Sequence, residues 1–166
     1  MIDTGYVRTM ARYNRWQNRS LYGAADTLAD AERREDRGAF FGSIHNTLAH
    51  LVWGDRMWMS RFDGWERPTL GPADGDGWEW DALKAERERQ DAAILDWAGR
   101  VTEADLAGEC RWYSGLMKAD LTRPMGLVVA HFFNHQTHHR GQAHALLTAL
   151  GATPEATDLG FMPDDV

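Results

Sequence analysis

The segment at residues 124–151 constrains the fold most strongly, because its apolar side chains follow the period of one helix face along its whole length. It begins with a proline, which is favoured in a first helical turn, and ends at a glycine, which is favoured just beyond a helix. Five of the seven histidines of the chain lie between residues 130 and 144. The segment therefore predicts one long helix with a buried face that carries histidines. The side chains of that face are Val128, Phe132, His135, His139, Ala143, Leu146 and Leu150.

The clustered histidines do not share one helix face. His135 and His139 are four residues apart in the apolar stripe, whereas His131 lies on a more polar strip. His144 and Arg140 fall on the side that we expect to face solvent. Imidazoles at positions i and i+4 can converge on one metal ion, but positions i and i+8 are about 12 Å apart along the helix axis. Buried imidazoles need partners for their ring nitrogens, so we interpret His135 and His139 as candidate metal ligands.

Three earlier segments also carry apolar residues at helical spacing, which predicts an all-α fold of four helices. Their approximate bounds are residues 3–29, 43–62 and 81–100. Ser43 is a favoured N-cap for the second of them. Residues 109–114 and 116–121 alternate weakly on either side of Gly115, and we expect a short hairpin there before the last helix.

The connecting segments differ in composition. The highly charged stretch at residues 30–38 is expected to be a solvated linker, whereas residues 63–80 form a long loop rich in glycine and proline. The tryptophans that flank this loop either hold it on the bundle, which we favour, or border a ligand cleft. Residues 152–166 are expected to pack over the bundle through apolar side chains such as Leu159 and Phe161.

Several polar side chains stand at expected core positions. Asn14 and Gln17 interrupt the apolar stripe of the first helix, so they either bond to the backbone or lie near a polar site inside the bundle. His50 lies beside the stripe of the second helix, where its spacing alone favours a structural role. Arg87 and Asp91 are four residues apart and can form an ion pair, which contributes little if it is exposed.

Composition and charge exclude several classes of function. The formal charge is −7 and no basic block is present, so binding to nucleic acid through phosphate neutralisation is a poor fit. No apolar run approaches the ~20 residues of a membrane span, and residues 1–10 lack the apolar core of a signal peptide. The length of 166 residues favours one domain over residues 1–166. The single cysteine, Cys110, favours a cytoplasmic location.

Three stretches of the sequence resemble the DinB-like family of bacterial proteins. They are residues 13–18 (YNRWQN), residues 38–51 (GAFFGSIHNTLAHL) and residues 133–142 (FNHQTHHRGQ). The resemblance implies an up-up-down-down four-helix bundle that often forms a homodimer. It also implies a metal centre, usually occupied by zinc or nickel, that is built from one histidine of the second helix and two of the fourth.

The positions that match this centre are His50, His135 and His139, so the resemblance raises His50 from a structural histidine to an expected ligand. His45 and His138 belong to the recurring pattern but lie outside the triad. Four side chains are candidates for orienting the ligand imidazoles. They are Asn14, Gln17, Asp55 and His138.

Three neutral imidazoles leave open positions on the ion for water or a small-molecule ligand, whereas structural zinc sites are usually closed by four protein ligands. The resemblance implies a metal-dependent thiol S-transferase. In such an enzyme the metal holds a low-molecular-weight thiol, such as mycothiol or bacillithiol, as thiolate for transfer to an electrophile. An alternative is a non-catalytic metal-binding stress-response protein. A third interpretation is a bundle whose histidines are only structural.

Overall fold

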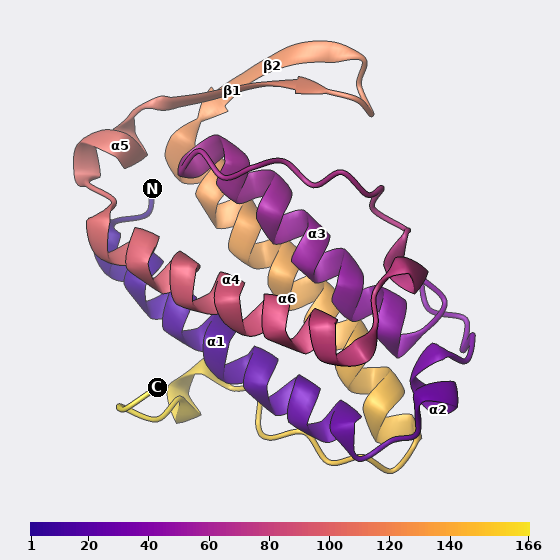
Figure 1. Ribbon diagram of the computed structural model, residues 1–166. Helices are drawn as coiled ribbons and strands as arrows, with labels where there is room; N and C mark the ends of the chain where they lie inside the picture. Colours follow the sequence, from indigo (N-terminus) through magenta and orange to yellow (C-terminus); the bar gives the residue numbers. More distant parts are fainter.

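Four long helices make up most of the fold (Figure 1). The computed structural model describes residues 1–166, apart from the side chain of Asp76. Among the described residues, no helix has both the length and the apolar composition of a membrane span. The long helices are α1 (Thr4–Asp26), α3 (Ile44–Phe62), α4 (Trp80–Arg100) and α6 (Met125–Ala149). The short elements are α2 (Asp30–Arg34), α5 (Glu103–Ala107), strands β1 (Glu109–Ser114) and β2 (Ala119–Pro124), and the 3-10 turns η1 (Gly75–Gly77) and η2 (Leu159–Phe161).

Helix α1 packs against both α4 and α6. It runs antiparallel to α4, because Trp80 at the start of α4 donates a hydrogen bond of 2.7 Å to Asp26 at the end of α1. It runs parallel to α6, because Tyr6 near the start of α1 packs edge-on against Phe133 in the first half of α6. Both directions can be followed in Figure 1.

Helices α3 and α4 run parallel to each other. Asp55 pairs with Arg87 at 2.7 Å, and Phe62 at the end of α3 stacks on Trp97 near the end of α4. The directions along the chain are therefore up, down, down, up, which differs from the expected up-up-down-down order. The reason is the loop at residues 63–79, which returns along the bundle and lets two successive helices point the same way (Figure 1).

A buried polar layer divides the apolar core into two clusters. One cluster lies around the end of α1 and the other around its beginning. Between them, Arg87 lies 2.7 Å from Asp55 and 3.0 Å from Asp91, and Asn18 donates to Asp91 at 2.8 Å. All four side chains are buried. The ion pair that the spacing on α4 indicated is thus part of a central network and not a surface contact.

Two arginines that we expected near solvent are buried. The prediction that Arg140 faces solvent is wrong, because its guanidinium donates a hydrogen bond to Asn14 across the α1–α6 contact. The prediction of a solvated linker at residues 30–38 is wrong in part, because Arg33 in α2 donates to the carbonyl oxygen of Ala25 in the last turn of α1. Both partners belong to other helices, so helical spacing alone does not identify them.

Local signals set the ends of α3 and α6, which carry all seven histidines of the sequence. The Ser43 hydroxyl accepts a hydrogen bond from the backbone N–H of Asn46 at 3.1 Å, so the predicted N-cap of α3 is confirmed. Helix α6 ends at Ala149, and Gly151 follows two residues later with a φ of 81°, which is favourable for glycine. The backbone N–H groups of Gly151 and Ala152 bond back to Thr148 and Leu147, which satisfies the last carbonyl groups of the helix.

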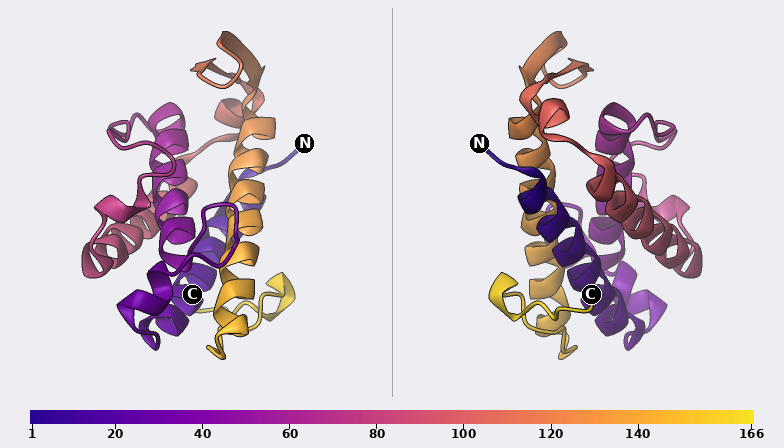
Figure 2. Two further views of the ribbon diagram at one scale, coloured as in Figure 1. Left: turned by 90° about the vertical axis from the view of Figure 1, so that its right-hand side faces the viewer. Right: turned by 90° about the vertical axis from the view of Figure 1, so that its left-hand side faces the viewer.

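The hairpin modifies the all-α prediction only slightly. Strand β1 has the predicted bounds, whereas β2 begins at Ala119 and not at residue 116. Residues 115–118 form the turn, in which Lys118 has a φ of 50°. The hairpin extends beyond one end of the bundle in the side views of Figure 2.

The C-terminal segment lies toward the other end of the bundle (Figure 2). Hydrogen bonds from α1 hold it: Gln17 donates to the carbonyl oxygen of Ala156 at 2.9 Å, and Trp16 donates to Glu155 at 2.7 Å. The predicted apolar packing through Leu159 and Phe161 is wrong, because both side chains are exposed. Polar contacts with α1 replace the expected burial of apolar surface.

The long loop at residues 63–79 is fastened to the bundle by tryptophans. Trp65 packs against one apolar cluster and Trp78 against the other. The indole N–H of Trp53 on α3 donates to the carbonyl oxygen of Leu70 at 2.9 Å. These contacts hold the middle of the loop beside α3, where it meets the histidines described below.

Candidate metal centre

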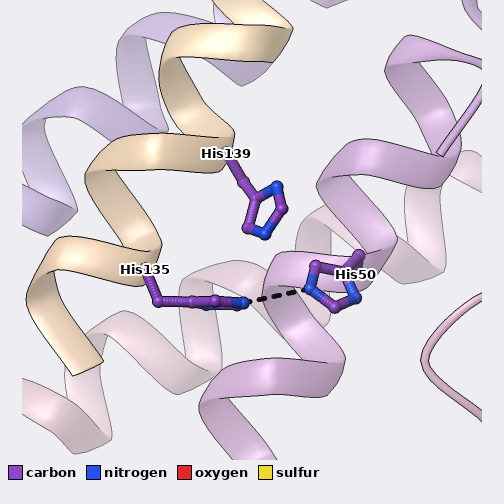
Figure 3. Close-up of side chains that lie close together, drawn as sticks. All are labelled: His50, His135 and His139. Atoms are coloured by element: carbon purple, nitrogen blue, oxygen red, sulfur yellow. Dashed lines mark hydrogen bonds between the residues drawn. The ribbon is translucent and has the colours of Figure 1, made fainter. Parts of the chain in front are cut away.

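The imidazoles of His50, His135 and His139 converge between α3 and α6 (Figure 3). One ligand nitrogen from each ring lies within 4.8 Å of the other two, and Nε2 of His50 is 3.1 Å from Nε2 of His135. Tetrahedral zinc with Zn–N bonds of about 2.0–2.1 Å needs nitrogens about 3.4 Å apart. Small side-chain adjustments therefore suffice for the three nitrogens to bind one ion.

Two acceptors orient the ligand rings. Nδ1 of His50 lies 2.9 Å from the carbonyl oxygen of Pro72 in the long loop. Nδ1 of His139 lies 2.8 Å from Oε1 of Gln142, one helical turn further along α6. A ring that donates from Nδ1 keeps its Nε2 lone pair free for a metal ion. The backbone of the loop and a side chain of α6 thus favour the tautomer that a metal ligand requires.

Burial keeps the three imidazoles neutral. It lowers the pKa of His50 to about 4, although the hydrogen bond to Pro72 acts in the opposite direction. Burial, together with the neighbouring histidines, lowers the pKa of His135 to about 3. The pKa of His139 is also lowered by burial, against the opposing effect of Gln142. All three rings are therefore available as ligands near neutral pH without prior loss of a proton.

Aromatic rings surround the outer side of His50. The Phe41 ring stacks on it with a centroid distance of 3.9 Å, and the Trp53 ring stacks at 5.6 Å. Phe41 also lies 5.3 Å from the ring of His139. These contacts restrict the rotation of His50 and place apolar surface beside the nitrogens, which strengthens electrostatic interactions there.

A glycine on α3 allows the close approach of His135. A Cβ atom at Gly54 would lie 3.0 Å from Cε1 and 3.5 Å from Nδ1 of that imidazole. Glycine within a helix lowers the stability of that helix by roughly 1 kcal/mol relative to alanine. A glycine in the middle of α3 therefore indicates a packing constraint. The space beside Gly54 is filled by the ligand ring.

Gly54→Ala is expected to weaken metal binding about 10-fold or more, because the added methyl group displaces His135 from its present position. Competition with a chromophoric zinc chelator measures the change. Gly23→Ala is the matched control, since no heavy atom lies within 4 Å of its new Cβ. It should leave metal affinity unchanged and stabilise α1 by roughly 0.5–1 kcal/mol. Unaltered affinity in Gly54→Ala would contradict this assignment.

The other predicted polar residues have partners away from the three nitrogens. Asn14 accepts from Arg140, Gln17 donates to the C-terminal segment, and Asp55 pairs with Arg87. His138 lies closer, with its ring 4.8 Å from that of His139 and its Nε2 3.3 Å from Nε2 of Gln142. Of the four candidates, His138 is therefore the one with a described contact to a ligand ring.

The remaining histidines have other surroundings. His45 is buried, and its Nε2 lies 3.0 Å from the carbonyl oxygen of Gly75. His131 is exposed, and its ring lies 5.1 Å from Trp58 and 6.1 Å from His135. The structure therefore gathers His50, His135 and His139 and leaves His45 outside the group.

Sequence reasoning missed several residues that shape the centre. Gln142 lies three positions after His139, so the helical spacing of the two side chains was an available signal. Phe41 lies in the stretch at residues 38–51 that resembles the DinB-like family, but the sequence does not show that it stacks on His50. Gly54 follows no metal-binding motif. The carbonyl oxygen of Pro72 depends on the path of the loop, which no local pattern specifies.

Gln142→Ala is expected to lower metal affinity by about 10- to 100-fold, because His139 loses the acceptor that orients its Nδ1–H group. Gln142→Glu keeps an acceptor oxygen at this position and should retain most of the affinity. Isothermal titration calorimetry with zinc measures both variants. Equal affinity of Gln142→Ala and the unaltered protein would show that this hydrogen bond has no orienting role.

Three comparisons relate the chain to known proteins. Residues 1–165 match the family model described as "DinB family". The chain is 23% identical over 164 residues to Protein DinB of Bacillus subtilis (strain 168), across 90% of this chain and 88% of that protein. It also resembles the crystal structure of a DinB-like protein from Bacillus cereus ATCC 10987, with a TM-score of 0.62 and 17% identity, over 85% of this chain and 90% of that chain. At this identity the structural likeness concerns the fold.

Proposed function

The chain belongs to the DinB family, and from this premise we propose that it binds a divalent metal ion and activates a low-molecular-weight thiol for S-transfer to an electrophile. The proposed ligands are His50, His135 and His139. The observation that carries the proposal is the convergence of their three ligand nitrogens within 4.8 Å of one another. Imidazole ligands suit zinc and nickel, which are the proposed occupants.

The donor set favours an open site over a closed structural one. Among the described residues, the group consists of three histidines and includes no cysteine or carboxylate. Structural zinc sites normally have four protein ligands. A bound divalent ion would have room for a small-molecule ligand, and would favour the thiolate form of a thiol there. Pro72 and Gln142 would orient the rings of His50 and His139 around the ion.

The thiol of the proposed reaction has to come from outside the chain. Cys110 is the single cysteine of the sequence, and its side chain is buried in the hairpin. Burial raises the pKa of its thiol, although Arg61 has the opposite influence. A buried, protonated thiol is a poor nucleophile. This supports a separate, small thiol as the cosubstrate.

Two measurements test the proposal in sequence. Metal analysis of protein purified without a histidine tag is expected to find about one divalent ion per chain. A transfer screen then combines the loaded protein with several cellular thiols and a reactive electrophile. We expect turnover that stops when a chelator removes the metal and returns when zinc or nickel is added. Stoichiometric metal without turnover for any thiol would instead favour a non-catalytic metal-binding protein.

The assembly and the location belong to the same proposal. We propose a homodimer in the cytoplasm, as the family resemblance and the single cysteine led us to expect. Sedimentation equilibrium measures the mass in solution, and a mass of one chain at micromolar concentration would contradict the dimer.

A further inference from the structure

A second feature of the surface is a groove between the hairpin and the helices α3 and α6. Its volume is 640 Å³, within the usual range for small-molecule sites. Three half-buried tryptophans line it: Trp53 and Trp58 from α3, and Trp112 from β1. Their indole rings give the groove an apolar lining that suits an aromatic ligand.

The groove also carries positive charge without a balancing carboxylate. Arg61 and Arg123 line it, and no aspartate or glutamate is among its described lining residues. The guanidinium of Arg61 lies 4.2 Å from the centre of the Trp58 ring and 5.4 Å from that of Trp112. In a chain with a formal charge of −7, this local excess of guanidinium groups is unusual.

The register of the hairpin explains the local charge. Arg123 is paired with Cys110, so both side chains lie on the same face of the two strands, which includes Trp112 two residues further along β1. Glu109 and Asp120 alternate with these residues and lie on the opposite face. The hairpin thus presents an arginine toward the groove and its acidic side chains away from it.

The groove is next to the candidate metal centre, although none of the three ligand histidines lines it. Trp53 lines the groove and stacks on the ring of His50. His131 also lines the groove, and its ring lies 6.1 Å from that of His135. A ligand in the groove is therefore separated from the ligand rings by single side chains, those of Trp53 and His131.

We propose that this groove binds a planar organic anion, which is the electrophilic acceptor of the transfer reaction. The sulfur of the thiol forms a bond to one carbon of an electrophilic double bond of the anion, and the other carbon takes up the proton that the thiol has lost. Its acidic group pairs with Arg61 and Arg123, and its flat apolar body rests on the tryptophans. The inference rests on the proposed function for the role of the anion as acceptor. The binding itself depends on the groove and not on the metal, so the two can be tested separately.

The test compares 2-naphthoate with its neutral counterpart 2-naphthalenemethanol, by calorimetric titration of metal-free protein. Chelation removes the metal ion, so the carboxylate of the probe cannot bind to it directly. We expect 2-naphthoate to bind about 10-fold tighter or more, and Arg123→Leu and Arg61→Leu each to weaken it about 5- to 10-fold. Arg111→Leu is the matched control, because Arg111 lies on the other face of the same hairpin.

The outcomes separate the two proposals. Equal binding of the two probes, or an equal loss in Arg111→Leu and Arg123→Leu, would overturn the groove as an anion site. His139→Ala should lose metal binding but retain 2-naphthoate binding, because anion binding depends on the groove and not on the metal. If thermal melting shows that Arg61→Leu is unfolded, the comparison of Arg123→Leu with Arg111→Leu provides the test, because Arg123 is exposed.

Discussion

His139→Ala is expected to lower the affinity for a divalent metal ion by more than about 100-fold, so that stoichiometric binding is lost at micromolar concentrations. Loss of a supporting hydrogen bond alone typically costs 10- to 100-fold, and this variant removes a ligand atom from a centre that has three protein ligands. Zinc titration against a chromophoric chelator measures the change. Removing His139 also leaves two imidazoles, which hold an ion too weakly to compete with a buffer chelator.

His144→Ala is the matched control for this variant. His144 is on the same helix, five residues further along, and it is outside the group of converging nitrogens. The control should bind metal as the unaltered protein does. Retention of metal by both variants to the same extent would show that the assignment of ligands to one face of α6 is wrong.

Arg87→Ala is expected to destabilise the fold by about 3–5 kcal/mol, because it leaves two buried carboxylates without their shared cation. Arg87 lies 2.7 Å from Asp55 and 3.0 Å from Asp91, and all three are buried. Burial raises the pKa of Asp55 to about 6, and Arg87 acts in the opposite direction. The ionised form of Asp55 is therefore stabilised by this guanidinium. Urea unfolding followed by circular dichroism measures the free energy of unfolding.

Arg100→Ala provides the comparison on the same helix. Its guanidinium contacts Asp63 and Asp96 at the surface, where solvent screens the charges. We expect no resolvable loss of stability from this change. A similar loss in the two variants would mean that the buried network contributes no more than a surface ion pair.

The helices were predictable because their signals are local. The N-cap Ser43 and the terminal Gly151 depend on neighbouring residues only, and the structure places both at the predicted helix ends. Strand β1 was predictable for the same reason, whereas the start of β2 depended on the conformation of the turn before it. The face of α6 likewise identified His135 and His139 from spacing alone.

The contacts between helices were not predictable from local pattern. Helical spacing places Arg140 on the solvent side of α6, because its partner, Asn14, lies on another helix 126 residues away. The parallel run of α3 and α4 depends on the path of the long loop, and so does the carbonyl oxygen of Pro72 beside His50. His50 itself entered the site only through the family resemblance. Long-range partners of this kind appear only when the helices are placed together.

Anomalous scattering locates a bound metal ion directly, in a crystal grown with zinc and with data collected above and below the zinc absorption edge. We expect one strong peak between α3 and α6, about 2.0–2.1 Å from a ring nitrogen of each of His50, His135 and His139. The absence of a peak there, or a peak of equal strength at His138 or His144 instead, would contradict a three-histidine metal centre.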